Sequence, residues 1–505
     1  METGQEDKAT PRFLKRRDRV AILVILLAAF CLRLWGLGEK SLWLDEIMTV
    51  ENASRPFGEM IEHLEEFDAH PPLYQALVWL WLRVGTGDGF VRFPSALAGC
   101  ASVFLVYLIA RRLMGRRAAL VAATFMALSS FQIYYSQEAR LFALLCALFL
   151  AQFYVLLRIL HQRGRAHWVW WALYGVLIAV SLFTYVLSIL AIGAFGALYL
   201  WLSRRGRRIQ WAQLILVHMI VALLFYATWY PHLVQQSKDL KENIALRHDA
   251  KGRPGAVALL NGAAVWGFGP QREETGLLVP ILGAGIVAAA AVAIATRRTK
   301  RPAVILGALF ALPLIGYMIL PMPRVQAYDP KHLVFLQPLL FIALAGARRA
   351  PGVLAGRKRL GPLPYAMLAV IALNLFSLGD YFHPEREKEN WRDLFAYVDE
   401  RVTPNDAFIF EPEYTGFAFS YYARTAEARA GVRILMERGL GRNIGPALRR
   451  IWLIECRSAV AGLHPERRER MQAAGWTVSE AKACDGMVGR LEATLFLRNG
   501  EGPGP

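Results

Sequence analysis

The sequence predicts a polytopic α-helical membrane protein that ends in a small α/β domain. Of its 505 residues, 55% are hydrophobic and 12% are aromatic, and the mean hydropathy is +0.31. This composition is too apolar for a soluble enzyme of this length. The net charge of +18 comes from short Lys and Arg clusters between apolar stretches. That distribution is typical of basic residues on the cytoplasmic side of a membrane, and it argues against a nucleic-acid partner, which would need a basic face.

The chain begins with a basic segment, residues 1–19, that contains Lys15, Arg16, Arg17 and Arg19. The positive-inside rule places this segment in the cytoplasm and directs the first span, about residues 20–37, outward. The leucine-rich core of that span and the lack of a small-residue cleavage site favour an uncleaved anchor over a signal peptide.

A membrane span needs about 20 mostly apolar residues. The run from Leu73 to Val84 is shorter, so it predicts a helix at the outer interface. With that choice, eleven spans alternate across a bacterial plasma membrane, with the N-terminus inside and the C-terminus outside. They lie near residues 20–37, 91–113, 118–136, 140–160, 168–185, 186–203, 209–231, 277–296, 302–323, 333–347 and 363–379. Their cytoplasmic ends carry the Arg and Lys clusters.

The pattern changes beyond Asp380, where apolar runs shorten and charges of both signs mix. Residues 380–505 therefore predict an extracytoplasmic α/β domain. Its expected elements are a helix at 391–401, strands at 407–411 and 451–456, a helix at 465–474 and a strand at 488–497. Cys456 and Cys484 fall in this domain, where an oxidising environment would permit a disulfide.

With this topology, several ionisable residues fall at the outer surface of the membrane. Ionisable groups at membrane depth are costly and mostly functional, so charges of both signs in one layer predict a site that binds an anion and moves a proton. They are Asp45, Glu46, Asp68, His70, Arg92, Glu138, Arg140, Arg324, Lys331 and His332.

Each of these residues also has an ordinary structural explanation. Asp45 could cap the following helix, with Glu46 as a favourable first-turn charge. His70 could simply be an extended residue before Pro71, and Arg92 could anchor a helix end at the interface. Glu138 and Arg140 could pair with each other or serve as helix-end charges. Lys331 and His332 could anchor the start of a span at the interface.

Four short motifs occur in order along residues 40–145. They are Leu-Trp-Leu-Asp45-Glu46, Asp68-x-His70-Pro71-Pro72-Leu73, Arg92-x-Pro94-Ser95-Ala96-x-x-Gly99 and Tyr135-Ser136-Gln137-Glu138-Ala139-Arg140. Together they resemble the GT-C glycosyltransferases of the protein mannosyltransferase class, family 39. That class includes the protein O-mannosyltransferases and the lipid A aminoarabinose transferases. The resemblance is weaker but collinear through the later spans.

The resemblance implies a GT-C transmembrane catalytic domain at residues 20–379, with the catalytic motifs in a first outer loop at 38–90 that contains interfacial helices. It implies a membrane enzyme that takes a sugar from a polyprenyl-phosphate carrier on the outer face and passes it to a protein, lipid or glycan acceptor. The acidic pair matches at Asp45 and Glu46 as catalytic residues, with Asp45 as the catalytic acid and Glu46 as a helper. One departure is Lys331-His332, where relatives often have Arg-Tyr.

The chemistry of such a transfer agrees with these residue types. An inverting transfer needs a base for the acceptor proton, and a carboxylate such as Asp45 suits that task. The leaving phosphate needs cations rather than an acid, and Arg92, Arg324 and Lys331 could supply them. Asp45, Glu46 and Glu138 could also hold a divalent metal ion through oxygen ligands.

A polytopic transporter or lipid flippase is the alternative, because such proteins also keep charges inside the membrane. A transporter should hold its charges near the bilayer midplane and show repeat symmetry, whereas here they fall at the outer mouth. A third alternative places the activity in the C-terminal domain with the spans as an anchor. That domain shows no nucleophile and base pair and no metal-ligand spacing.

Overall fold

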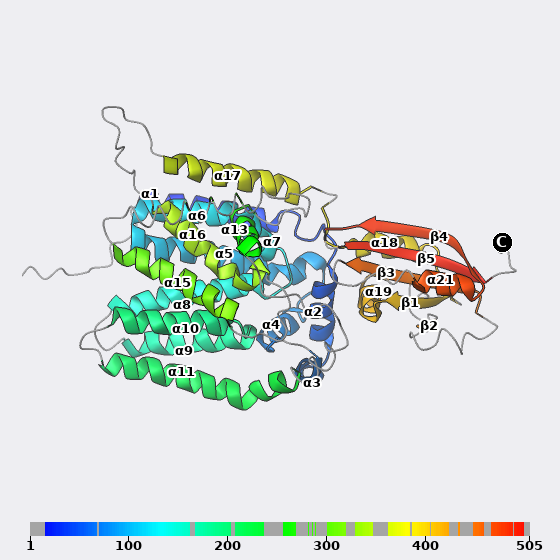
Figure 1. The fold of residues 1–505 in the computed structure, drawn as a ribbon, viewed down its shortest axis with the longest axis horizontal. Helices are drawn as coiled ribbons and strands as arrows, with labels where there is room; N and C mark the ends of the chain where they lie inside the picture. Colours follow the sequence, from blue (N-terminus) through cyan, green and yellow to red (C-terminus); the bar gives the residue numbers. More distant parts are fainter. Residues whose placement is uncertain are drawn as a thin grey trace, which may run out of the picture.

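The computed structural model contains a bundle of roughly parallel helices with a β-sheet at one end of it (Figure 1). The structure describes residues 16–67, 70–161, 167–203, 208–236, 256–268, 281, 285, 288, 300–319, 329–346, 362–383, 386–404, 406–423, 433–434, 448–458, 466–487 and 489–498.

The helices of the bundle follow the apolar segments of the sequence. They are α1 (Arg16–Leu34), α5 (Asp88–Met114), α6 (Arg116–Leu128), α7 (Ser130–Ser136), α8 (Phe142–His161), α9 (His167–Thr184), α10 (Ser188–Leu202), α11 (Arg208–Thr228), α13 (Ala256–Phe268), α15 (Lys300–Ile319), the 3-10 helix η2 (Pro330–Leu336), α16 (Gln337–Ala345) and α17 (Pro362–Tyr381). The predicted span at 277–296 lies almost wholly outside the described residues.

Within the described residues, four helices are long and apolar enough to cross a membrane, and a bent pair would make a fifth. They lie at Asp88–Met114, Phe142–Leu160, Gln210–Thr228 and Arg301–Ile319. Shorter apolar helices coincide with other predicted spans, so the protein is a polytopic helical protein while the count of eleven stays a prediction. The face of α11 that bears Ile215, Met219 and Leu223 is exposed, as expected for side chains that contact lipid tails.

The bent pair consists of α6 and α7, which meet at an angle of 57°. The last carbonyls of α6 lack partners within the helix. Arg33 of α1 supplies them: its guanidinium donates to Met126 O at 3.1 Å and to Ala127 O at 3.3 Å, and its Nε donates to Ser136 Oγ at 3.2 Å. A fully buried arginine is therefore explained by the break in a neighbouring span.

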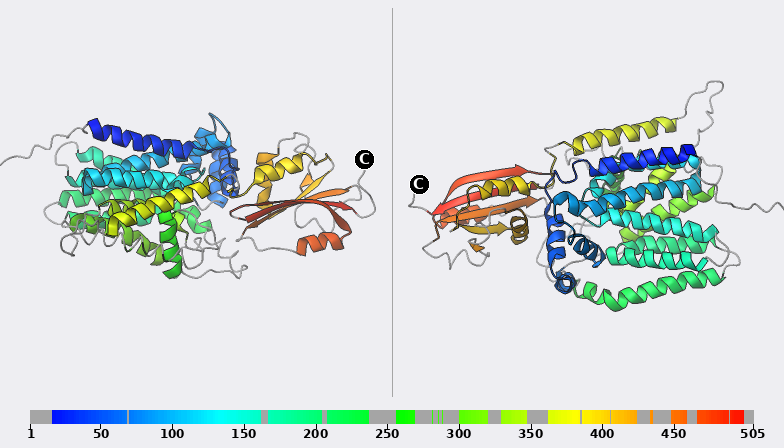
Figure 2. Two further views of the ribbon diagram at one scale, coloured as in Figure 1. Left: turned by 90° about the horizontal axis from the view of Figure 1, so that it is seen from above. Right: turned by 180° about the vertical axis from the view of Figure 1, so that it is seen from behind.

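Three shorter helices, α2 (Leu44–Ser54), α3 (Phe57–Phe67) and α4 (Leu73–Trp81), follow α1. They lie at the end of the bundle that faces the sheet (Figure 2). The predicted helix at 73–84 is confirmed over Leu73–Trp81. The indole of Trp79 donates to Arg55 O at 3.1 Å, and that of Trp81 donates to Phe90 O at 2.8 Å. These bonds tie α4 to the end of α2 and to the start of α5.

The C-terminal region is a five-stranded mixed sheet in the order β2-β1-β3-β5-β4. Its elements are α18 (Trp391–Asp399), β1 (Ala407–Glu411), the 3-10 helix η3 (Glu413–Thr415), α19 (Gly416–Tyr422), β2 (Arg433–Ile434), β3 (Arg450–Ser458), α21 (Glu466–Ala473), β4 (Trp476–Asp485) and β5 (Gly489–Arg498). β1 runs parallel to β2 and β3, and β5 runs antiparallel to β3 and β4. All five predicted elements are present, whereas β2, β4 and α19 were not predicted.

Strand β4 escaped prediction because it is a largely exposed edge strand with few apolar residues. The register also explains why the two cysteines do not form a disulfide. Cys456 of β3 and Cys484 of β4 both pair with Leu491 of the intervening strand β5. Two strand spacings of about 4.8 Å separate them, which exceeds the reach of a disulfide, and both thiols are free.

One apolar cluster joins α2 and the segment before it to the C-terminal region. Leu42, Ile47 and Val50 pack in the same buried core as Trp391 and Phe395. Because α2 and α18 share this core, the helix that carries the acidic pair is held by a part of the chain about 345 residues away.

Candidate functional site

Glu46 lies in the first turn of α2 and is completely buried. Its Oε1 accepts hydrogen bonds from Arg92 Nε at 2.9 Å and from the backbone N–H of Ala139 at 2.6 Å. Its Oε2 accepts from Arg92 Nη2 at 2.6 Å and from the N–H of Trp43, the N-cap residue, at 3.3 Å. Glu46 therefore caps its own helix and binds α5 and the 137–140 turn, which uses all of its acceptor capacity.

Arg92, near the start of α5, directs all five N–H groups of its guanidinium into the protein. Beyond the two bonds to Glu46, Nη1 donates to Leu37 O at 3.1 Å and to Lys40 O at 2.8 Å, and Nη2 donates to Ser41 O at 2.9 Å. A guanidinium has five such donors. In this geometry Arg92 holds the turn that leads into α2, and no donor remains for a phosphate.

Asp45 differs from its neighbour in being accessible: its side chain is 39% exposed. Its Oδ2 lies 3.3 Å from Arg140 Nη2, and Arg140 Nη1 also donates to Asp45 O at 3.2 Å. The alternative of Asp45 as the helix cap is wrong, because Trp43 occupies that position. The proposed pairing of Glu138 with Arg140 is not seen either, since Arg140 pairs with Asp45.

Glu138 is buried and forms an ion pair with Lys388, a residue that follows α17. The Lys388 ammonium also lies 4.3 Å from the centre of the Trp43 ring and 4.2 Å from that of Tyr134. Burial lowers the pKa of Lys388 to about 7, although the carboxylates of Glu46 and Asp45 oppose that shift. A cation between two aromatic faces and a carboxylate is thus held at the centre of the site.

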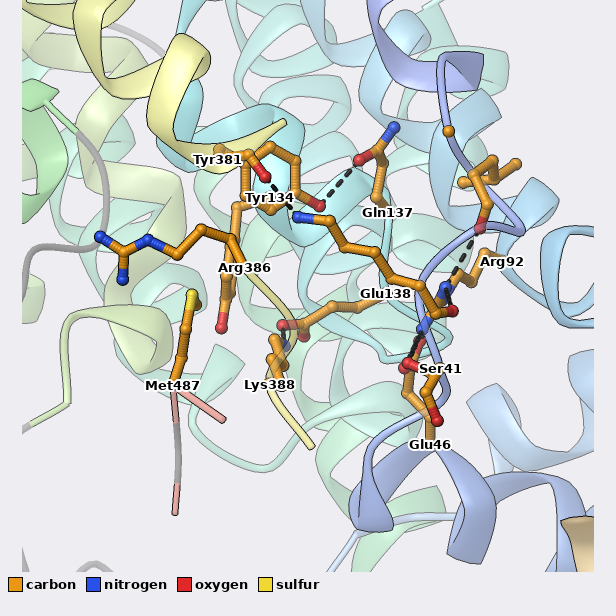
Figure 3. Close-up of a pocket in the computed structure, with 13 residues that line it drawn as sticks. Ser41, Glu46, Arg92, Tyr134, Gln137, Glu138, Tyr381, Arg386, Lys388 and Met487 are labelled. Carbon is orange, nitrogen blue, oxygen red and sulfur yellow. Dashed lines mark hydrogen bonds and ion pairs between the residues drawn. The ribbon is translucent and has the colours of Figure 1, made fainter. Parts of the chain in front are cut away.

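A pocket opens beside these residues, between the end of the helical bundle and the sheet (Figure 3). Met487, from the turn between β4 and β5, contributes to its wall, so the C-terminal region lines the site directly. The lining residues are Gly36, Leu37, Lys40, Ser41, Glu46, Arg92, Tyr134, Gln137, Glu138, Tyr381, Arg386, Lys388 and Met487. Burial lowers the pKa of Lys40 to about 8.

A second group of site residues lies further along an aromatic wall. His70 stacks on Tyr185 with ring centres 5.6 Å apart, and His332 meets the edge of the same ring at 6.2 Å. His332 Nδ1 also lies 3.3 Å from Tyr317 Oη, and Lys331 Nζ lies 2.9 Å from Asp329 Oδ2. This group combines imidazoles and an ammonium, the types of donor that bind a phosphate.

The aromatic wall connects the two groups through successive ring contacts. Tyr134 contacts Tyr135 at 5.0 Å, Tyr135 contacts Phe142 at 5.4 Å, and Phe142 contacts Tyr185 at 6.3 Å. Of the predicted site residues, the structure therefore brings together Asp45, Glu46, Arg92, Glu138 and Arg140 around α2, and His70, Lys331 and His332 around Tyr185. Asp68 and Arg324 lie outside the described residues.

Comparison with known proteins supports the family suggested by the motifs. Residues 69–234 match the family described as dolichyl-phosphate-mannose-protein mannosyltransferase. The fold is similar to that of ArnT from Cupriavidus metallidurans in the apo state, with a TM-score of 0.60 and 14% identity over 95% of this chain and 98% of that one. The family match and the fold similarity therefore agree with the resemblance that the motifs indicated.

The chain is also similar in fold to ArnT from the same organism bound to undecaprenyl phosphate, with a TM-score of 0.58 and 14% identity. That match covers 94% of this chain and 97% of the other. No curated protein sequence matches.

The three carboxylates considered as metal ligands do not converge in the structure. Asp45, Glu46 and Glu138 each pair with a different cation, namely Arg140, Arg92 and Lys388. Among the described residues, no group of three or more His, Cys, Asp or Glu side chains has the geometry to hold a metal ion. The residues therefore do not fit the metal site considered from the sequence.

Sequence reasoning missed Lys388, Lys40 and Arg386, all of which line the pocket. The signal that could have found Lys388 is the charged run Glu385-Arg386-Glu387-Lys388-Glu389 immediately after a predicted outward span. That run resembles an ordinary solvated linker, and only the core that α2 shares with α18 and α19 brings it to the site.

Proposed function

We propose that this protein is a membrane glycosyltransferase that moves a sugar from a polyprenyl-phosphate carrier to an acceptor hydroxyl on the extracytoplasmic face of a bacterial plasma membrane, with Asp45 as general base. The reaction inverts the anomeric centre because the acceptor oxygen attacks directly as the carbon–phosphate oxygen bond breaks. The acceptor is a protein, a lipid or a glycan.

The observation that carries the proposal is the division of labour between two adjacent carboxylates. Glu46 is buried and its oxygens are used by Arg92, Ala139 and Trp43. Asp45, one position earlier on α2, keeps a carboxylate oxygen accessible beside the pocket end of the bundle. A general base must reach the proton that it removes, and of the pair Asp45 meets that requirement.

Two comparisons support a polyprenyl-phosphate donor. The matching family is described by its dolichyl-phosphate-mannose substrate, and one ArnT structure of similar fold contains undecaprenyl phosphate. Both lipids join a polyprenyl chain to a phosphate. The apolar helices of this chain supply an environment for such a tail.

The group around Tyr185 supports a place for the donor phosphate. Lys331, His70 and His332 lie there on elements packed within the helical bundle, close to where a lipid tail would enter. A phosphate leaving group is already acidic, so these donors need only stabilise its charge and not protonate it. Arg140 lies between this group and Asp45, since it pairs with Asp45 and acts electrostatically on Tyr185.

The position of the charged groups favours transfer over transport. α2 lies at the end of the bundle that faces the sheet, rather than halfway along the helices (Figure 1), and the pocket is lined by Glu46 of α2 and by Lys40 and Ser41 just before it. A transporter would hold its substrate site near the midplane.

The test is reconstitution of the purified protein with a panel of radiolabelled polyprenyl-phosphate sugars and a membrane extract as the acceptor source. Wild type is expected to consume at least one donor, and Asp45→Asn is expected to lower the rate by about 10²–10⁴-fold. Glu51→Gln is the matched control, because Glu51 is a half-exposed carboxylate on the same helix. The proposal fails if no donor is consumed, or if Asp45→Asn is as active as the control.

A further inference from the structure

The segment 387–392, which we name the strap, follows α17 and includes the first two residues of α18. It lies against the turn that precedes α2. Glu387 Oε2 accepts from the N–H of Ser41 at 3.4 Å, and Arg392 Nη1 donates to Glu39 O at 2.7 Å. On its other side, Glu387 O accepts from the N–H of Met487 at 2.8 Å. The strap is therefore held between the first outer loop and the turn between β4 and β5.

Glu389 makes the contact closest to the proposed base. Its Oε2 accepts from the N–H of Leu44 at 2.7 Å, and Leu44 is the first residue of α2. The first N–H groups of a helix need partners from outside the helix, and the N-cap Trp43 supplies no side-chain bond. Glu389 fills that need from a distant part of the chain, with a negative charge placed at the helix N-terminus.

Glu389 is itself rigidly held. The indole N–H of Trp391 donates to the same Oε2 at 2.7 Å, and Trp391 is fully buried in the core shared by α2 and α18. The side chain of Glu389 is also buried. A carboxylate that is shielded from water and fixed by a buried tryptophan can hold its partner helix at one position.

Lys388 makes the second contact, across the site. Its ammonium lies over the ring of Trp43, which is two residues before Asp45. It also contacts Tyr134 and Glu138, which line the pocket with it (Figure 3). One side chain of the strap therefore holds the spacing between the start of α2 and the 137–140 turn, while the next one caps α2.

We propose that the strap is a positioning element for Asp45, in which Glu389 fixes the N-terminus of α2 and Lys388 fixes the gap between Trp43 and Glu138. This inference rests on the proposed function for its effect on catalysis. It makes the C-terminal region part of the catalytic unit, because the strap is continuous with α18. Neither residue contacts the reacting atoms; both act through the placement of Asp45.

The first test measures the placement without any substrate. Hydrogen exchange of the backbone of residues 41–47 is compared between wild type and Glu389→Ala, Glu389→Gln and Glu400→Ala in lipid nanodiscs. Glu400→Ala is the control, because Glu400 belongs to the same region and its side chain is 72% exposed. Glu389→Ala should speed exchange in this segment by about tenfold, the size expected for loss of a charged hydrogen bond. Glu389→Gln, whose amide oxygen can still accept from Leu44, should stay near wild type.

The second test measures turnover with the donor that wild type consumes. Glu389→Ala should lower kcat by about tenfold or more and leave KM for the lipid donor within about twofold. Glu389→Gln should recover most of kcat. A merely structural function for Glu389 would lower the amount of active protein without this recovery, so binding of undecaprenyl phosphate is measured in parallel to count intact sites.

The inference is overturned if Glu389→Ala leaves exchange and kcat unchanged, or if Glu389→Gln behaves like Glu389→Ala. These outcomes differ from failure of the proposed function, in which wild type consumes no polyprenyl-phosphate sugar or Asp45→Asn stays active. The exchange measurement needs no donor, so it tests the strap in either case.

Discussion

Glu46 and Arg92 form a bidentate ion pair, with 2.9 Å between Oε1 and Nε and 2.6 Å between Oε2 and Nη2. Both side chains are buried, and together they join α2, α5 and the turn before α2. Through Ala139 the same carboxylate reaches the 137–140 turn. The residue that carries no proposed chemistry thus organises the place where its neighbour Asp45 would act.

Removal of Glu46 should destabilise the protein strongly. Glu46→Ala leaves a buried arginine without its counter-charge, a change that costs roughly 3–5 kcal/mol of folding free energy. The thermal unfolding midpoint in detergent should fall well below that of Glu51→Gln, a half-exposed acid on the same helix. Equal midpoints for the two variants would contradict the structural function given to this pair.

The glycine of the third motif should tolerate no side chain. A Cβ on Gly99 would lie 2.7 Å from Arg33 Nε and still closer to Ser136 Oγ. Gly99→Ala should therefore disrupt the bonds that cap the end of α6 and lower stability by roughly 1–3 kcal/mol. Gly193→Ala on α10, where no atom lies within 4 Å of the new Cβ, should be neutral or stabilising by up to about 1 kcal/mol. Thermal unfolding of both variants decides whether their effects differ in sign.

The pH dependence of stability should reveal the buried Lys388. Its pKa in the folded protein is about 7, whereas that of an unfolded lysine is about 10.4. Between these values the unfolded state binds more protons, so this group makes the folded protein more stable as pH rises from about 7 to 10. The groups that face Lys388 are Glu138, Glu46, Asp45, Arg92 and Glu389.

The measurement is the difference in unfolding midpoint between wild type and Lys388→Met from pH 6 to pH 10, since the other groups titrate in both. Wild type should gain relative to the variant above about pH 7. Lys482→Met, an exposed lysine of β4, should show no such trend. A constant difference across the range would contradict the lowered pKa.

Asp88 should control the attachment of the C-terminal region to the bundle. It accepts from Arg392 at 2.6 Å, from Tyr421 at 2.9 Å and from Tyr422 at 2.8 Å. Asp88→Ala removes the acceptor of three donors, and each lost bond of this kind costs about 1–3 kcal/mol. Limited proteolysis should cleave the variant faster than wild type near the junction of α17 and α18. Asp485→Ala, whose side chain is 83% exposed, should be cleaved at the wild-type rate.

Much of the helical architecture could be predicted from the apolar segments. A membrane span must hydrogen-bond its own backbone groups as a helix, and its long apolar run is easy to recognise in the sequence. The C-terminal helix at Trp391 and the strand at Ala407 also followed local periodicity. Strand β4 did not, because its register with β5 and not its own alternation makes it a strand. The helix α13 was also missed, since at 13 residues it is too short to indicate a span.

The candidate site divides in the same way. Asp45, Glu46, Arg92, Glu138 and Arg140 stood out because charge at membrane depth is costly wherever the chain folds. Their ion-pair partners could not be predicted from the sequence. Arg140 pairs with Asp45 rather than with Glu138, and Glu138 pairs with Lys388. Local spacing favours neighbours in the chain, whereas burial favours whichever opposite charge the fold brings nearest.

The sequence by itself determined that this protein is a polytopic membrane protein with several charged residues near the ends of its apolar segments, because hydropathy and charge act locally and need no knowledge of the fold. Only the tertiary structure decided which carboxylate stays accessible and which becomes part of the framework. Asp45 and Glu46 are adjacent in the chain, but the helical turn of α2 directs Glu46 into a core completed by Arg92 and leaves Asp45 exposed. That difference also depends on Lys388 and Glu389, which contact Trp43 and Leu44 at the start of α2 although they lie about 345 residues away in the chain.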